Sequence, residues 1–164
     1  MPQWGLSLTL LAAVLPSSAA MGASDEYERV QLVSERRGLM FDIQTAYLAL
    51  LSVNQGNNAD LSKAAEDAKT IGEKLKAFVS LLHPDTASGQ VPNSRAKQEI
   101  WRDAEPFAAA VDALMVASAT LSEIASQGDL DRFNTQFEAV AKACTGCHGL
   151  RPSSGGRFRT ESQF

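Results

Sequence analysis

The chain has 164 residues, of which 45% are hydrophobic and 21% are charged, and its formal net charge is −4. This length is that of one domain large enough to bury a core, and the composition is that of a globular protein rather than a disordered one. The acidic balance argues against nucleic acid as a partner.

The first 23 residues contain no charged side chain and are typical of a secretory signal peptide. An apolar run from Leu6 to Leu15 precedes a group of small residues. The run is shorter than the roughly 20 residues that a membrane span requires. We therefore expect cleavage after Ala20 or Ala23, export to the bacterial periplasm, and no membrane span in the mature chain.

The rest of the chain is predicted to form four helices. Apolar residues recur at intervals of three and four in every segment, and no segment alternates with a period of two. The breaks NQGNNAD, HPDTASGQVPNS and SQGD contain Gly or Pro and end on the expected capping residues Asp60, Ser94 and Asp129. The helical periodicity predicts an all-α fold. Because the first and third breaks are short, we further predict an antiparallel up-down-up-down four-helix bundle.

Two further features concern the limits of these helices. Pro106 is expected to kink or break the third helix. After a bundle domain spanning residues 24–151, residues 152–164 lack periodicity and are expected to form a flexible C-terminal tail.

The segment KACTGCHGL contains both cysteines of the chain. Cys144 and Cys147 continue the apolar seam of the fourth helix, and His148 lies four residues after Cys144, close to the same face. The spacing C-x-x-C-H is the signature of covalent haem attachment. Two thiols hold one edge of the porphyrin, and the adjacent imidazole reaches the iron. We therefore expect one haem c in the bundle core near one end.

Two other kinds of site use a similar spacing. A disulfide oxidoreductase places C-x-x-C at a helix N-terminus, where the helix dipole lowers the thiol pKa, whereas here the pair is at the C-terminal end of a helix. A structural zinc site needs four ligands, and outside this segment only His83 remains to offer one. Haem attachment is therefore favoured over both alternatives.

Other inward positions can be placed beside this segment by counting along antiparallel helices. At about 1.5 Å per residue, Arg36 lies level with Cys147, Met40 lies about one turn away, and Trp101 is near the same end. A buried charge at Arg36 would need a partner, and haem propionates would supply one. Two simpler alternatives remain: Arg36 could extend to the helix end, or Arg37 could take the inward role.

The other candidates each have a simpler alternative. Met40 is either core packing or the sixth iron ligand opposite His148. Trp101 is expected to line the haem pocket. His83 precedes a proline in the longest break, and we interpret it as a solvated loop residue.

The sequence resembles the class II c-type cytochromes, the cytochrome c′ family. The resemblance covers Tyr27 to Arg151 and rests on the C-x-x-C-H near the C-terminus, on EIWRDAEPF and on GDLDRFNTQFEAVAKAC. It implies that Arg36 lies near the propionates and that Met40 occupies the distal position. Five-coordinate members have an apolar residue such as leucine there, so methionine indicates the low-spin, His/Met-ligated branch. The stretch CHGLRPSS departs from the family, which makes a role for Arg151 doubtful. The family also implies a homodimer through the first two helices.

Two functions are consistent with these residues. The first is a periplasmic electron carrier, not an enzyme, with His148 and Met40 as axial ligands and with periplasmic redox proteins as partners. The second is a five-coordinate haem protein that binds NO or CO as a carrier, scavenger or sensor. A third reading, a haem-free dithiol or metal-binding helical protein, would require that no haem be attached.

Overall fold

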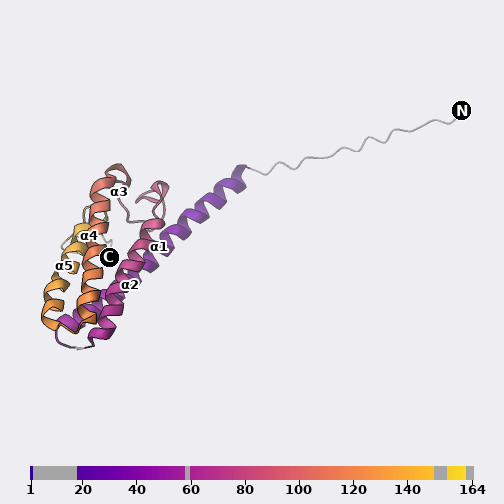
Figure 1. The fold of residues 1–164 in the computed structure, drawn as a ribbon. Coiled ribbons are helices and arrows are strands. Elements are labelled where there is room, and N and C mark those ends of the chain that lie inside the picture. The colour runs from indigo at the N-terminus through magenta and orange to yellow at the C-terminus, as the bar shows by residue number, and fades with distance from the viewer. Residues whose placement is uncertain (2–17, 58–59, 150–154, 162–164) are drawn as a thin grey trace.

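A computed structural model describes residue 1 and residues 18–57, 60–149 and 155–161. The expected signal peptide lies largely outside the described residues, as does Arg151. Five α-helices and one 3-10 turn make up the described fold (Figure 1). They are α1 (Ser18–Asn54), α2 (Leu61–Ser80), η1 (Pro84–Thr86), α3 (Glu99–Arg102), α4 (Ala104–Ser126) and α5 (Leu130–His148).

The four long helices form the expected bundle. α1 packs mainly on α2, α2 on α4, and α4 on α5, whereas α1 and α5 touch over a shorter stretch. The N-terminal part of α1 projects beyond the other helices (Figure 1). The prediction of an all-α four-helix bundle is confirmed, and solved structures of the same architecture are described below.

The core contains the apolar stripes that the sequence pattern identifies. Phe133, Leu50 and Val140 are fully buried, and Tyr47 of α1 stacks on Phe137 of α5 with their ring centroids 5.3 Å apart. Leu130, at the first position of α5, is exposed, contrary to expectation. It lies at a helix end, where the bundle no longer covers the inward face.

The helix starts follow the capping residues in two of three cases. The carboxylates of Asp60 and Asp129 accept hydrogen bonds from the amides of Lys63 and Arg132 at 2.9 and 3.0 Å. Ser94 does not cap the third helix, because α3 begins only at Glu99 and the Ser94 hydroxyl instead donates to a loop carbonyl.

The expected break at Pro106 is present as a division into two helices. α3 ends at Arg102 and α4 begins at Ala104, two residues before the proline. Pro106 therefore lies in the first turn of α4, where its missing N–H removes no intrahelical hydrogen bond.

The C-terminal end differs from the flexible tail that we expected. Residues 155–161, here called the C-terminal strap, pack along the loop before α3, and Phe158 is 3% exposed. The remainder of the expected tail, 152–154 and 162–164, lies outside the described residues. A sequence without periodicity can still be ordered when one large apolar side chain is buried.

Among the described residues, one helix has the length and hydropathy to cross a membrane, and this helix is α4. In the bundle it packs between α2 and α5 and contributes Leu114, Ser118 and Leu121 to the buried interior. The same composition is expected of a core helix.

Candidate functional site

The C-x-x-C-H segment forms the last turns of α5. Cys144 is half-buried and packs against the hydrophobic core, as the helical phase predicts. Cys147 and His148 are also half-buried, and neither cysteine forms a disulfide. His148 is the last residue of the helix, and Gly149 follows it with a φ of 76°. Two thiols and an imidazole are thus presented on about one helical turn.

The protonation states of these groups disfavour dithiol redox chemistry. Burial raises the pKa of Cys144 to about 11, with a contribution from Cys147, and burial also raises the pKa of Cys147. A redox dithiol needs the opposite shift, because the thiolate is the nucleophile. Burial, then the charges of Arg159 and Arg95, lower the pKa of His148 to about 4. The imidazole is therefore neutral, which is the form that binds a metal.

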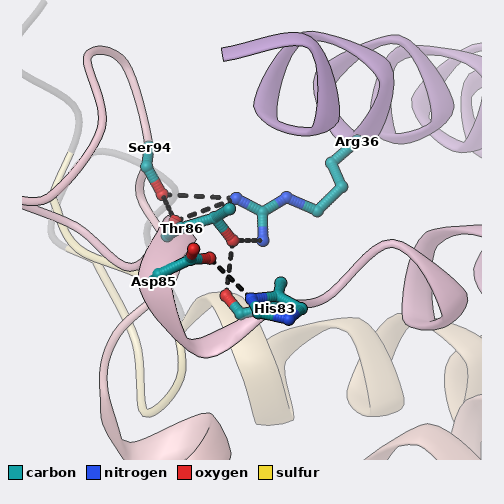
Figure 2. Close-up of polar contacts among 5 residues, drawn as sticks. All are labelled: Arg36, His83, Asp85, Thr86 and Ser94. Atoms are coloured by element: carbon teal, nitrogen blue, oxygen red, sulfur yellow. Dashed lines mark hydrogen bonds and ion pairs between the residues drawn. The ribbon is translucent and has the colours of Figure 1, made fainter. Parts of the chain in front are cut away.

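A protein-only metal site has little support in the described ranges. No group of three or more His, Cys, Asp or Glu side chains there is arranged to hold a metal ion. His83 is exposed and bonds Asp85 through Nδ1 at 2.6 Å (Figure 2), in agreement with its interpretation as a loop residue.

Arg36 is held by the loop between α2 and α3. Its side chain is directed inward, at 4% exposure, as the helical phase predicts. Its Nη1 donates to Thr86 Oγ1 at 2.9 Å, and its Nη2 donates to the Thr86 carbonyl at 3.1 Å and to Ser94 Oγ at 3.4 Å (Figure 2). Arg37, the alternative inward residue, is exposed.

The charge of Arg36 is compensated only by neutral acceptors in this arrangement. No carboxylate of the described residues forms an ion pair with it, and burial lowers its pKa. In the same loop, Nη2 of Arg95 is buried with no hydrogen-bond partner in the described structure. A buried cation is costly without a partner. The carboxylates of haem propionates fit the need of the buried Arg36 for a negatively charged partner, and they would also supply an acceptor for Nη2 of Arg95.

Arg36 and the cysteine pair lie at the same end of the bundle. Tyr47 stacks on Phe137 across the antiparallel helices α1 and α5. Arg36 precedes Tyr47 by eleven residues and Cys147 follows Phe137 by ten, so equal rises along both helices bring them level. The thiols, the imidazole and the guanidinium therefore lie at the same end of the bundle.

Met40 and Trp101 have less specific surroundings. Met40 is half-buried and packs against the hydrophobic core. Trp101 is half-buried on the short helix α3, beside the buried Ile100. Their assignments to a haem pocket therefore stay predictions.

Sequence reasoning did not find the residues that support the site from the loop and the strap. Thr86 and Ser94 bind Arg36, while Gly156 and Phe158 contact the end of α5. The paired glycines at 155 and 156, followed by RFR in an otherwise polar end, were a signal that could have indicated an ordered turn.

Comparisons with known proteins agree on one family. A family model described as Cytochrome C′ matches residues 31–150. Cytochrome c′ of Rubrivivax gelatinosus is 29% identical over 89 residues, which cover 54% of this chain and 67% of that protein. Its crystal structure has a TM-score of 0.66 at 24% identity, over 74% of this chain and 94% of that one. A nitric oxide complex of a mutant cytochrome c prime from Alcaligenes xylosoxidans has a TM-score of 0.69 at 21% identity, over 82% and 97%.

These comparisons contradict the interpretation that placed the chain in the low-spin branch. The matched family and the curated relative are cytochromes c′, whose haem iron is typically five-coordinate. The expectation of an electron carrier, in which Met40 joins His148 as a second axial ligand, is therefore wrong. It rested on the identity of one residue, and an unbranched methionine also serves as adaptable core packing.

Proposed function

The chain belongs to the cytochrome c′ family, and from this premise we propose that it is a five-coordinate haem protein that binds NO or CO. The observation that supports the proposal is that the C-x-x-C-H end of α5 and the buried Arg36 lie at the same end of the bundle. Family membership implies a covalently bound haem c. We propose one such group per chain, held as follows.

Each residue of the site would have a separate task in holding the haem. Cys144 and Cys147 would fix it covalently through thioethers, and the neutral His148 would bind the iron from one side. Arg36 would bind a propionate in addition to its loop partners, and Trp101 would pack at the pocket wall. When bound, the haem supplies an iron atom that can take a small diatomic ligand.

Met40 would form part of an apolar wall on the distal side. Its packing against the hydrophobic core supports this role, because a side chain used as packing is not free to approach the iron. An apolar wall excludes water and disfavours charged ligands, which selects for small neutral molecules such as NO and CO. Structures of the Alcaligenes xylosoxidans protein include variants bound to nitric oxide and to carbon monoxide.

The optical spectrum of the ferrous protein with and without CO tests this function. We expect a high-spin spectrum that changes on stoichiometric CO binding. Met40→Leu should leave that spectrum high-spin, because leucine supplies a similar apolar volume. Met115→Leu, at a partly buried core position of α4, is the matched control.

The opposite result is equally well defined. A low-spin wild-type spectrum that CO leaves unchanged, and that becomes CO-sensitive in Met40→Leu, would restore Met40 as the sixth ligand and refute the proposal. A reduced-pyridine haemochrome assay on the same samples measures the number of covalent haems per chain. A result of zero would favour the haem-free reading.

We also propose that the protein works in the periplasm and that it forms a homodimer through α1 and α2. The exposed apolar residues Tyr27, Phe41 and Leu48 of α1 support a dimer, since their separations are multiples of seven and place them on one side of the helix. NO or CO binding would serve as the basis of a carrier, a scavenger or a sensor.

A further inference from the structure

The C-terminal strap is tied to the loop before α3 by backbone hydrogen bonds. Ala96 and Arg159 form an antiparallel bridge. The Lys97 amide donates to the Phe158 carbonyl at 3.0 Å, and the Thr160 amide donates to the Arg95 carbonyl at 2.9 Å. The strap is therefore a short extended segment with a defined partner.

The same segment contacts the end of α5. The Phe158 amide donates to the Cys147 carbonyl at 3.3 Å. A Cβ on Gly156 would lie 2.4 Å from each of three atoms: the Cys147 carbonyl oxygen, the His148 carbonyl carbon and the Gly149 amide nitrogen. Only glycine permits so close an approach to backbone atoms. The strap thus rests directly on the peptide units on either side of His148.

Two side chains anchor the strap in this position. Phe158 is 3% exposed and packs edge-on against Phe107 of α4, with the ring centroids 5.2 Å apart. The ammonium group of Lys97 donates to the Gly156 carbonyl at 2.7 Å. The strap therefore joins α4, the loop and the end of α5.

The position of His148 in α5 makes such support necessary. His148 is the last residue of the helix, where the final carbonyl groups have no intrahelical partner and where helices fray. The Cys147 carbonyl is one of these groups, and the strap supplies its donor. An iron ligand at a frayed helix end would not keep one orientation.

We propose that the strap fixes the backbone around His148 and that Gly156 is the positioning residue through which it acts. The inference rests on the proposed function in that His148 is the iron ligand. The antiparallel bridge between Ala96 and Arg159 holds the strap in this position.

Gly156→Ala in the haem-bearing protein tests the proposal. The added methyl group cannot be accommodated against the Cys147 to Gly149 backbone, so the strap should separate from α5. We expect a shifted or broadened iron–histidine stretching band in the resonance Raman spectrum of the ferrous protein. We also expect amide exchange at Gly149 to accelerate by at least about tenfold. Gly38→Ala is the matched control, because a Cβ there meets nothing within 4 Å.

A second pair of variants separates positioning from a steric artefact. Phe158→Ala adds no atoms and should give the same two changes, whereas Phe158→Leu keeps a large apolar side chain and should restore most of the wild-type band. An unchanged band and unchanged exchange in both Gly156→Ala and Phe158→Ala would overturn the proposal. Amide exchange does not depend on the sixth ligand. A wild-type protein that does not bind CO would therefore refute the proposed function, whereas the amide-exchange test of the strap would stay valid.

Discussion

The Arg36 side chain is buried although its guanidinium keeps a positive charge. A helix pattern read from the sequence places it inward, and the requirement for a partner follows from the cost of burying a cation. The structure adds the identity of the first partners. They are the hydroxyl and carbonyl of Thr86 and the hydroxyl of Ser94, which lie 50 and 58 residues away in the sequence.

Thr86→Val should destabilise the protein by about 1–3 kcal/mol. Thr86 is fully buried, and its hydroxyl accepts from Arg36 Nη1 and donates to the His83 carbonyl. Valine would leave Arg36 Nη1 without this acceptor, and the His83 carbonyl would keep only the hydrogen bond from the residue-86 amide. Urea unfolding measures the loss. Thr70→Val is the control, because that exposed hydroxyl bonds only a carbonyl of its own helix. Equal effects of the two substitutions would contradict the role given to Thr86.

At the scale of elements, the loop between α2 and α3 has two structural roles that its sequence pattern does not indicate. Residues Thr86 and Ser94 bind Arg36 on α1, and the three residues that follow Ser94 bind the strap. One loop thereby holds the guanidinium on one side and supports the end of α5 on the other. Its Gly and Pro residues correctly indicated a break, but not what the break would bind.

Pro106→Ala should change the free energy of unfolding by less than about 1 kcal/mol. A proline inside a helix costs about 3 kcal/mol, but Pro106 lies in the first turn of α4, where the amide has no intrahelical acceptor. Thermal and urea unfolding of the variant and the wild type provide the measurement. A stabilisation close to 3 kcal/mol would show that the proline strains a continuous helix and that the α3–α4 division is wrong.

At the scale of the whole molecule, the bundle leaves large apolar side chains on the outer side of α1. Phe41 is 68% exposed and Leu48 is 53% exposed. Single exposed apolar residues are common on protein surfaces, whereas several on one helix face are typical of an interface.

The double substitution Phe41→Glu and Leu48→Glu should therefore convert a dimer into a monomer, measured by sedimentation at matched protein concentrations. Charges opposed across a symmetric interface repel each other and lose solvent on association. Val116→Glu, on α4, is the control, because Val116 is 66% exposed but lies on another helix. A wild-type protein that sediments as a monomer would contradict the dimer.

The sequence by itself determined the helical fold, the inward phase of Arg36 and the presentation of Cys144, Cys147 and His148 on one helix end. These features depend on periodicity and on spacing within a helix, which local geometry sets. The C-x-x-C-H spacing also determined the expected cofactor. The identity of one residue at position 40 was not sufficient to determine the coordination of the iron, because the same thioether can pack or ligate.

Only the tertiary structure decided how the site is supported. The partners of Arg36 and the contact of Gly156 and Phe158 with α5 join segments that have no periodic pattern. Their order comes from burial of one aromatic ring and from backbone groups that find partners across the fold. Such contacts depend on where loops meet in space, which a one-dimensional pattern does not encode.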